Sequence, residues 1–263
     1  MKVRACIFNL GTIVDRYSLF PIVSLKNTFN KYGITLNNKL IYDNMGMSKL
    51  NHIREIIKNP YIKNIWNRRH GNYPGKKEEY ILYLDYIETE KLNILEHLDI
   101  VPETKHCINY IKNNDIKIGI TTSFNQEIML IIKNMLDDKG ILLDNYVSSS
   151  CLKEPSRPDP SMVLENLQRL NIKSPNNVIK VDNTCIGIEE GNNAGCITVG
   201  VSRWSPYMEI YDLNDEKHLT FKKLNKKDNK SKKMLKKANP DYLITTLYEL
   251  PNVIRDINKK FDS

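Results

Sequence analysis

Two apolar stretches of this sequence end in polar residues that could bind a ligand. Residues 5–8 lead into Asn9 and a Leu-Gly turn, and residues 116–120 lead into Thr121 and Thr122. Each stretch is typical of a buried strand that runs into a turn, although threonine also suits strand ends for structural reasons alone. Parallel α/β sheets bind their ligands at the carboxyl ends of the strands. The sequence therefore predicts a ligand site at the end of the first strand.

Two cations and a histidine extend the candidate chemistry. Lys49 and His52 lie three residues apart, so on a helix both side chains point to one side. Arg157 is a permanently charged group with five donors, which suits the binding of an anion. Each cation also has an ordinary explanation, because Lys49 fits a solvated helix face and Arg157 fits a loop before a helix. These residues by themselves leave both interpretations open.

The elements that must position these residues alternate along the chain. After the first strand we predict further strands, with helical patterns between most of them, at residues 116–122, 145–148, 178–181, 196–201 and 242–244. This alternation indicates an α/β fold with a parallel sheet and right-handed crossovers. Residues 18–98 show only helical patterns, which predicts an all-helical insert after the first strand.

Charge is concentrated in one segment. The chain carries a formal net charge of +8, and residues 222–237 hold nine lysines and one aspartate, Asp228, so this segment alone accounts for it. The rest of the chain is formally neutral, which argues against a generally basic surface. We predict that residues 222–237 form a flexible loop, either simply solvated or in contact with a polyanion. The segment contains no aromatic residue for stacking on bases.

The remaining composition favours a cytoplasmic protein. No apolar run approaches the ~20 residues of a membrane span, and the sequence enters its first strand with no pattern of a signal peptide. The five cysteines are widely spaced and include no CxxC pair, so we expect reduced thiols and no zinc site.

Residues 5–15 (ACIFNLGTIVD) and 45–54 (MGMSKLNHIR) resemble the haloacid dehalogenase superfamily and, within it, the phosphonoacetaldehyde hydrolase (phosphonatase) branch. The resemblance covers nearly the whole chain. It implies a Rossmann-like core of residues 1–17 and 99–263 and a helical C1-type cap of residues 18–98.

The resemblance also implies roles for individual residues. The family's nucleophilic aspartate corresponds to Asn9, and the turn that follows is one residue shorter here. The family's imine-forming lysine and its histidine correspond to Lys49 and His52. Thr121 corresponds to the hydroxyl that binds a phosphoryl oxygen, and Arg157 to the arginine that neutralises the nucleophile and phosphate. Ligand contacts are implied for Gly11, Thr12, Met45, Thr122 and Arg157.

The expected metal site is degenerate. Asn183 and Gly187 stand where the family has two metal-binding aspartates, and Asn9 replaces a third carboxylate. Magnesium prefers anionic oxygen ligands, so we expect no metal and no other cofactor. Asp182 replaces a family glycine and brings a carboxylate one position early, which makes it a candidate substitute ligand.

These observations predict a phosphonatase-like protein that has lost hydrolysis, because a neutral amide cannot act as a carboxylate nucleophile. It would bind an anionic or phosphorylated small molecule or a protein partner, and a homodimer is compatible with the sequence. One alternative is a magnesium-dependent hydrolase of phosphorylated or phosphonate substrates that uses a site rearranged around Asp182. Another is an interaction protein that binds polyanions through residues 222–237.

Overall fold

The protein is built on a six-stranded parallel sheet. The computed structural model describes residues 2–152 and 157–262. The strand order is β3-β2-β1-β4-β5-β6. The strands are β1 (Ala5–Asn9), β2 (Lys117–Thr122), β3 (Asn145–Ser148), β4 (Val178–Asp182), β5 (Ile197–Val201) and β6 (Tyr242–Ile244). The predicted α/β class with a parallel sheet is confirmed.

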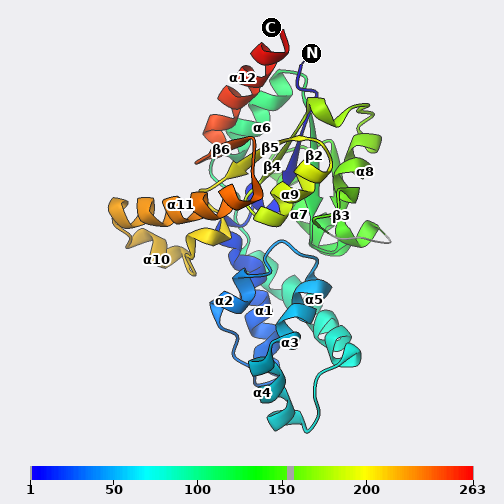
Figure 1. The fold of residues 1–263 in the computed structure, drawn as a ribbon, viewed down its shortest axis with the longest axis vertical. Coiled ribbons are helices and arrows are strands. Elements are labelled where there is room, and N and C mark those ends of the chain that lie inside the picture. The colour runs from blue at the N-terminus through cyan, green and yellow to red at the C-terminus, as the bar shows by residue number, and fades with distance from the viewer. Residues whose placement is uncertain (1, 153–156, 263) are drawn as a thin grey trace.

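Helices cover both faces of the sheet (Figure 1). They are α6 (Thr104–Asn113), α7 (Gln126–Asp138), α8 (Ser161–Arg169), α9 (Cys185–Asn193) and α12 (Leu250–Asp262). Successive side chains of a strand point to opposite faces. Accordingly, Cys6 and Phe8 belong to one hydrophobic cluster, and Ala5 and Ile7 belong to another. A sheet buried on both faces explains why the strands are continuously apolar.

The register of the strands brings three strand ends together. Asn9 pairs with Thr121 on β2, and Phe8 pairs with Val181 on β4. The chain leaves β1 with β2 on one side and β4 on the other, so the strand order reverses at β1. Ligands of open α/β sheets bind at such a switch point, beyond the carboxyl ends of the strands.

Five helices between β1 and α6 form a second hydrophobic cluster. They are α1 (Leu19–Lys31), α2 (Asn38–Tyr42), α3 (Lys49–Lys58), α4 (Pro60–His70) and α5 (Lys76–His97). Phe29, Ile53 and Trp66 are buried in this cluster. Local signals mark the boundaries of α4, because Asn59 caps it, Pro60 occupies its first position and Gly71 ends it with φ 74°. Figure 1 shows these helices grouped beside one end of the sheet.

The lysine-rich segment is not the predicted loop. Most of it forms α11 (Phe221–Leu235), which extends from the sheet beside the short α10 (Leu213–Lys217) (Figure 1). The Thr220 side chain caps α11 by accepting from Lys223 N. Lysine is a good helix former, and the less polar positions fall on one face, where Ser231 and Leu235 are buried. The prediction of a flexible loop was wrong because it rested on the lysine content of the segment and ignored the helical spacing of its less polar residues.

Short 3-10 helices complete the connections. They are η1 (Leu10–Thr12), η2 (Arg16–Ser18), η3 (Ser149–Cys151), η4 (Pro175–Asn177), η5 (Pro206–Met208), η6 (Lys236–Ala238) and η7 (Leu247–Glu249). In the described part of the chain, no helix has the combination of length and apolar character needed to cross a membrane.

Candidate functional site

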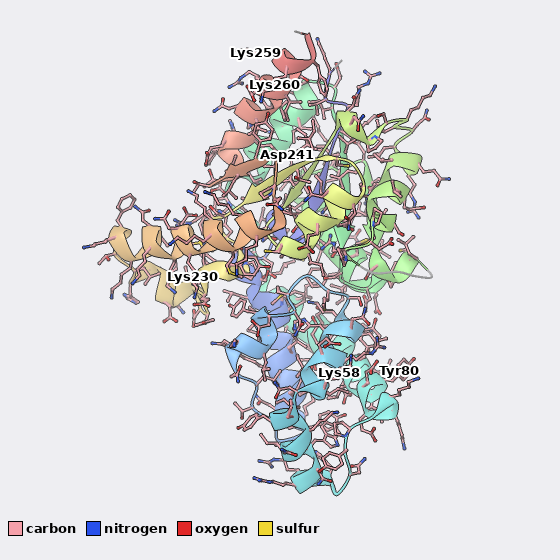
Figure 2. The ribbon with its side chains drawn as sticks, viewed as in Figure 1. Lys58, Tyr80, Lys230, Asp241, Lys259 and Lys260 are labelled. Carbon is pink, nitrogen blue, oxygen red and sulfur yellow. The ribbon has the colours of Figure 1, made fainter. Side chains whose placement is uncertain are left out.

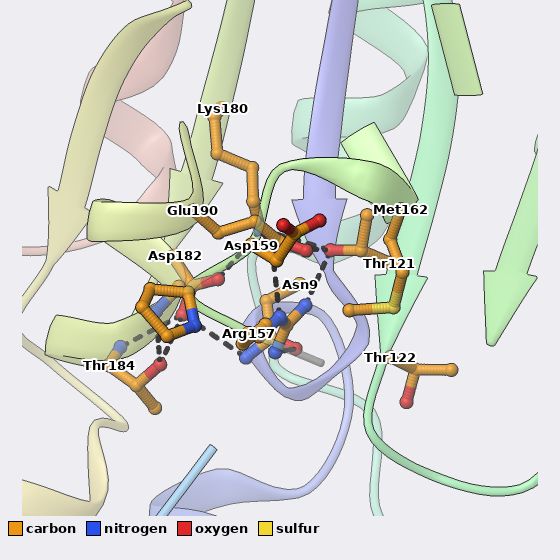
Figure 3. Close-up of polar contacts among 12 residues, drawn as sticks. Asn9, Thr121, Thr122, Arg157, Asp159, Met162, Lys180, Asp182, Thr184 and Glu190 are labelled. Atoms are coloured by element: carbon orange, nitrogen blue, oxygen red, sulfur yellow. Dashed lines mark hydrogen bonds and ion pairs between the residues drawn. The ribbon is translucent and has the colours of Figure 1, made fainter. Parts of the chain in front are cut away.

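Asn9 lies at the centre of a buried polar cluster where β1, β2 and β4 end (Figure 3). Its amide nitrogen donates to Asp182 Oδ1 at 3.3 Å and to Asn183 Oδ1 at 3.1 Å. Its amide oxygen accepts from Arg157 Nη1 at 3.2 Å. Both ends of the amide are therefore used in holding neighbouring side chains.

The turn after Asn9 is the 3-10 helix η1. Thr12 Oγ1 donates to the Asn9 carbonyl at 2.6 Å, and Asn183 Nδ2 donates to the Gly11 carbonyl at 2.9 Å. These bonds tie the turn to the ends of β1 and β4. Gly11 also lines the small cavity of the site.

Arg157 reaches the site from the loop between β3 and α8. Its guanidinium donates to Thr121 Oγ1 at 2.5 Å and to Glu190 Oε2 at 2.9 Å, in addition to Asn9. The structure thus brings together three of the residues singled out in the sequence, Asn9, Thr121 and Arg157. Thr122 is also buried, and its hydroxyl accepts from Phe124 N at 3.1 Å, which supports the turn after β2.

The sequence reasoning missed two buried charges of this cluster, Lys180 and Glu190. Lys180 Nζ donates to Thr121 Oγ1 at 3.0 Å and to Asp182 Oδ2 at 2.7 Å, and it lies 3.1 Å from Glu190 Oε2. The signal was a lysine inside an otherwise apolar strand, since lysine is almost never fully buried without a partner. Together with Arg157 and Asp182, these residues make two cations and two anions, so the formal charges of the cluster cancel.

Every oxygen of the Asp182 carboxylate accepts a hydrogen bond. Oδ1 accepts from the Thr184 backbone N at 2.9 Å, from Thr184 Oγ1 at 2.8 Å and from Asn9, and Oδ2 accepts from Lys180. Burial raises the pKa of Asp182, but the charges of Lys180 and Arg157 and the hydrogen bonds from Lys180 and Thr184 outweigh it, so the pKa is lower than usual. The carboxylate is ionised and internally satisfied.

The donor set does not fit a magnesium ion. Asn9 and Asn183 offer neutral amides that bond to each other, and Gly187 has no side chain. Asp182 is a carboxylate, but an ammonium group already occupies Oδ2 at 2.7 Å. Magnesium needs a near-octahedral shell of oxygens and is reluctant to lose water. Among the described residues, no group of three or more His, Cys, Asp or Glu side chains could hold a metal ion.

Lys49 enters the site from the first turn of α3. It is buried and lines a cavity of about 30 Å³ together with residues of the strand ends. The predicted residues that share this lining are Asn9, Gly11, Met45, Thr122 and Arg157. Burial lowers the pKa of Lys49 and the Arg157 charge lowers it further, whereas Glu90 and Asp15 oppose the shift. Lys49 therefore has the lowered basicity that a nucleophilic amine requires.

His52 is fully buried behind Lys49 in the α1–α5 region. Burial, followed by the Lys49 charge, lowers the pKa of His52 to about 3, so the imidazole is neutral near pH 7. It is not one of the described residues that line the cavity. The predicted neighbours Lys49 and His52 thus lie on one helix, but only Lys49 faces the strand ends.

The turn before α3 approaches α9 closely. Met45 and Gly46 line the cavity, and Gly46 has φ 97°. A Cβ atom at Gly46 would lie 2.5 Å from Ile186 Cγ2. Glycine at this position therefore adopts the positive φ without strain and leaves room for the Ile186 side chain.

Glu90, which the sequence did not suggest, is a buried acid whose charge interacts with that of Lys49. It comes from α5, accepts a hydrogen bond from the Tyr86 hydroxyl and is buried. Burial raises the pKa of Glu90 to about 7, although the Lys49 charge and the Tyr86 hydrogen bond act against this. Asp15 also has a raised pKa, chiefly because of burial, and its carboxylate accepts from Phe20 N at 2.9 Å.

Comparison with known proteins agrees with this architecture. The family model described as haloacid dehalogenase-like hydrolase matches residues 6–201. A phosphonoacetaldehyde hydrolase of Psychromonas ingrahamii is 31% identical over 97% of this chain and 87% of that protein. One of Vibrio campbellii is 30% identical over 98% of this chain and 96% of that protein.

A solved structure is also closely similar. The phosphonoacetaldehyde hydrolase-like protein of Oleispira antarctica superposes with a TM-score of 0.94 at 27% identity, over 99% of this chain and 94% of that one. These relatives and the matching family model support the same assignment. This chain belongs to the haloacid dehalogenase-like hydrolase family, in its phosphonoacetaldehyde hydrolase-like branch.

Proposed function

We propose that this protein has lost metal-dependent hydrolysis and binds an anionic, phosphate- or phosphonate-bearing small molecule between α3 and the strand ends. The α1–α5 helices act as a cap over this site. The family supplies the class of ligand, because the similar proteins of Psychromonas ingrahamii and Vibrio campbellii are named phosphonoacetaldehyde hydrolases.

The observation that carries the proposal is the bonding of Asn9. Asn9 corresponds to the family's nucleophile, and its amide bonds to Asp182, Asn183 and Arg157. An amide nitrogen that donates two hydrogen bonds cannot supply the electron pair of a carboxylate nucleophile. The anions of the cluster, Asp182 and Glu190, are paired with Lys180 and Arg157 instead of being arranged around a magnesium ion.

The capacity to bind an anion remains in two cations. Lys49 and Arg157 line the same cavity, one from α3 and one from the loop before α8. Glu190 offsets part of the Arg157 charge, so Lys49 contributes more than Arg157 to the positive electrostatic potential in the cavity. The cavity of about 30 Å³ is too small for a phosphonate, so α3 must move away from the strand ends to admit the ligand.

The alternative of an active site rearranged around Asp182 has less support. The carboxylate accepts from Lys180, Thr184 and Asn9, and breaking those bonds would leave a buried ammonium group without one of its partners. No observation within the described residues favours Asp182 as a nucleophile or metal ligand.

Two measurements on the intact chain test the proposal. A screen of phosphate esters and phosphonoacetaldehyde should show no turnover that magnesium stimulates. Calorimetry with methylphosphonate should show saturable binding that weakens about tenfold or more in Arg157→Lys, because lysine cannot reproduce the bidentate guanidinium. Exposed Arg68→Lys is the matched control. Magnesium-dependent turnover, or equal binding by both variants, would contradict the proposal.

A second candidate function rests on the outer face of α11. Lys222, Lys226 and Lys233 are exposed along about 16 Å of one face. Asp228, the one acidic residue of this stretch, points inward, where it accepts from Ser202 Oγ at 2.6 Å. Phe221, at the start of the helix, is 79% exposed. We propose that this face contacts acidic lipid headgroups, because lysines near an anionic membrane attract it and an exposed aromatic side chain can enter the interface.

Vesicle flotation tests this second candidate. Binding should require an anionic lipid, weaken with salt and fall about tenfold or more in Lys222→Gln/Lys226→Gln/Lys233→Gln. The control removes three exposed lysines elsewhere, Lys58, Lys77 and Lys105. Figure 2 shows Lys58 far from the α11 lysine Lys230. Binding to duplex RNA but not to vesicles would contradict a lipid partner.

A further inference from the structure

Two linkers join the α1–α5 helices to the rest of the protein. The first, residues 13–18, precedes α1, and the second, residues 98–103, follows α5. The two linkers lie side by side, because Val14 and Ile100 form an antiparallel bridge. Any movement of the α1–α5 helices relative to the sheet must therefore change the conformation of both linkers together.

The backbone of the first linker is strained. Asp15, Tyr17 and Ser18 have φ values of 64°, 63° and 56°. This left-handed region is unfavourable for residues that carry a Cβ atom. Strained residues of this kind persist only where the surrounding structure holds them in place. The contacts that hold residues 13–18 therefore decide whether this conformation is kept.

An insertion between β5 and β6 supplies these contacts. We call it the arm, and it comprises residues 202–238 with η5, α10 and α11. Tyr17 N donates to the Trp204 carbonyl at 2.7 Å, and the centroids of the two rings lie 5.5 Å apart. Trp204 Nε1 donates to Glu103 Oε2 at 3.0 Å. A single residue of the arm thus contacts both linkers.

Glu216 of α10 adds two ion pairs to this contact. Its carboxylate lies 3.3 Å from Arg16 Nη1 and 3.3 Å from Arg203 Nη2. Arg16 also binds the Asp99 carboxylate of the second linker. Both arginines lie over the Trp204 ring, with guanidinium carbons 5.2 and 4.6 Å from its centroid. These groups are only 15–24% exposed, so water screens them less than it screens a pair on the open surface.

We infer that the arm is a clamp on the two linkers, which holds the α1–α5 helices closed over the strand ends through Trp204 and Glu216. The arm also touches these helices directly, since the rings of Tyr42 on α2 and Tyr211 lie 5.7 Å apart. The arm therefore favours the closed arrangement without lining the cavity itself.

The consequence for ligand binding rests on the proposed function. The cavity of about 30 Å³ must widen before a phosphonate can enter, and the linkers must then change conformation. A ligand that binds only the opened protein has its apparent affinity reduced by the fraction of molecules that are closed. The clamp would therefore weaken binding at the strand ends, and Glu216 and Trp204 act as positioning residues outside the site.

Hydrogen exchange measures the clamp without any ligand. Asp15 N donates to Asp99 O and Tyr17 N donates to Trp204 O, both at 2.7 Å. In Glu216→Gln these two amides should exchange about three- to tenfold faster, because the charge on α10 that holds Arg16 is lost. The amides of the central strand β1 should not change. Asp215→Asn is the matched control, since it removes the same charge from an exposed position of α10.

Calorimetry with methylphosphonate on the intact chain tests the direction of the effect. Glu216→Gln should lower the Kd about three- to tenfold, because less of the protein must be opened by the ligand. Asp215→Asn should bind as the native protein does. General damage to the structure would weaken binding, so a tighter complex separates release of a clamp from loss of a structural contact.

The outcomes distinguish the clamp from the proposed function. If the Asp15 and Tyr17 amides exchange at native rates in Glu216→Gln, or equally fast in Asp215→Asn, the clamp is refuted. Weaker or unchanged binding by Glu216→Gln, where the native protein binds, also refutes it. If neither protein binds methylphosphonate, the proposed function fails, while faster exchange confined to the linkers still supports the clamp. Should Glu216→Gln not fold, Trp204→Phe gives the same comparison, because it removes only the bond to Glu103 and part of the ring.

Discussion

Lysines behave differently in the buried cluster and on α11. Lys180 has no exposed surface and lies between Asp182, Glu190 and Thr121. Lys222 and Lys226 are exposed on a helix whose one aspartate points inward. A buried charge must be matched by a partner of opposite sign, whereas an exposed charge is satisfied by water. The first kind of lysine maintains the fold, and the second kind is free to act on a partner.

Removing one member of the buried cluster should have the largest effect. Glu190→Ala takes a shared anion away from Arg157 and Lys180. We expect a loss of about 3–5 kcal/mol in the free energy of unfolding, because two cations remain buried with one fewer anion. Urea denaturation measures the loss. Exposed Glu189 on the same helix is the control, and Glu189→Ala should stay within about 0.5 kcal/mol of the native protein. Similar losses from both variants would mean that burial of charge does not distinguish them.

Chemical labelling should separate Lys49 from the lysines of α11. Burial lowers the pKa of Lys49, so its neutral amine appears at a lower pH than that of an exposed lysine. After incubation with phosphonoacetaldehyde and borohydride near pH 8, peptide mass spectrometry should find at least about tenfold more label on Lys49 than on any α11 lysine. The excess should shrink as the pH rises, because the exposed amines then lose their protons. Label spread evenly over the lysines would show that the cavity does not activate Lys49.

The helical state of α11 should depend on its cap. The Thr220 hydroxyl accepts from Lys223 N, and the following lysines add like charge to the helix. Thr220→Ala should destabilise the protein by about 1 kcal/mol and increase cleavage by trypsin within residues 222–237. Thr220→Ser should retain the cap and resist cleavage as the native chain does. If the alanine variant were as resistant as the serine variant, packing and not capping would hold α11.

Neutralising exposed lysines should have the smallest effect on the fold. Lys226→Gln/Lys233→Gln should change the free energy of unfolding by less than about 0.5 kcal/mol, since these side chains are solvated. A slight gain at low salt is expected because repulsion along the helix falls. Thermal unfolding at two salt concentrations measures both values. A large loss would show that the outer face of α11 packs against something in the native protein.

Much of the fold followed from local sequence patterns. The short strands at 145–148 and 242–244 were placed as the structure has them. The patterns of the first and second strands also predicted which residues meet at the strand ends, because Asn9 and Thr121 end neighbouring parallel strands. Such apolar runs and turn residues act over a few positions, so they can be read without knowing the rest of the chain. The α11 segment shows the limit, because its composition suggested disorder while its spacing specified a helix.

The sequence by itself determined that positions 9, 183 and 187 carry no carboxylate, and the family resemblance predicts that Asn9, Asn183 and Gly187 stand where a nucleophile and two metal ligands would be. Only the tertiary structure decided what took their place. Lys180 and Glu190 come from different elements, and only the structure places their charged groups 3.1 Å apart without solvent. The ion pair between Arg16 and Glu216 likewise exists only because α10 lies against the linker that precedes α1. Electrostatic balance and packing depend on distances between segments, and those distances are set by the fold as a whole.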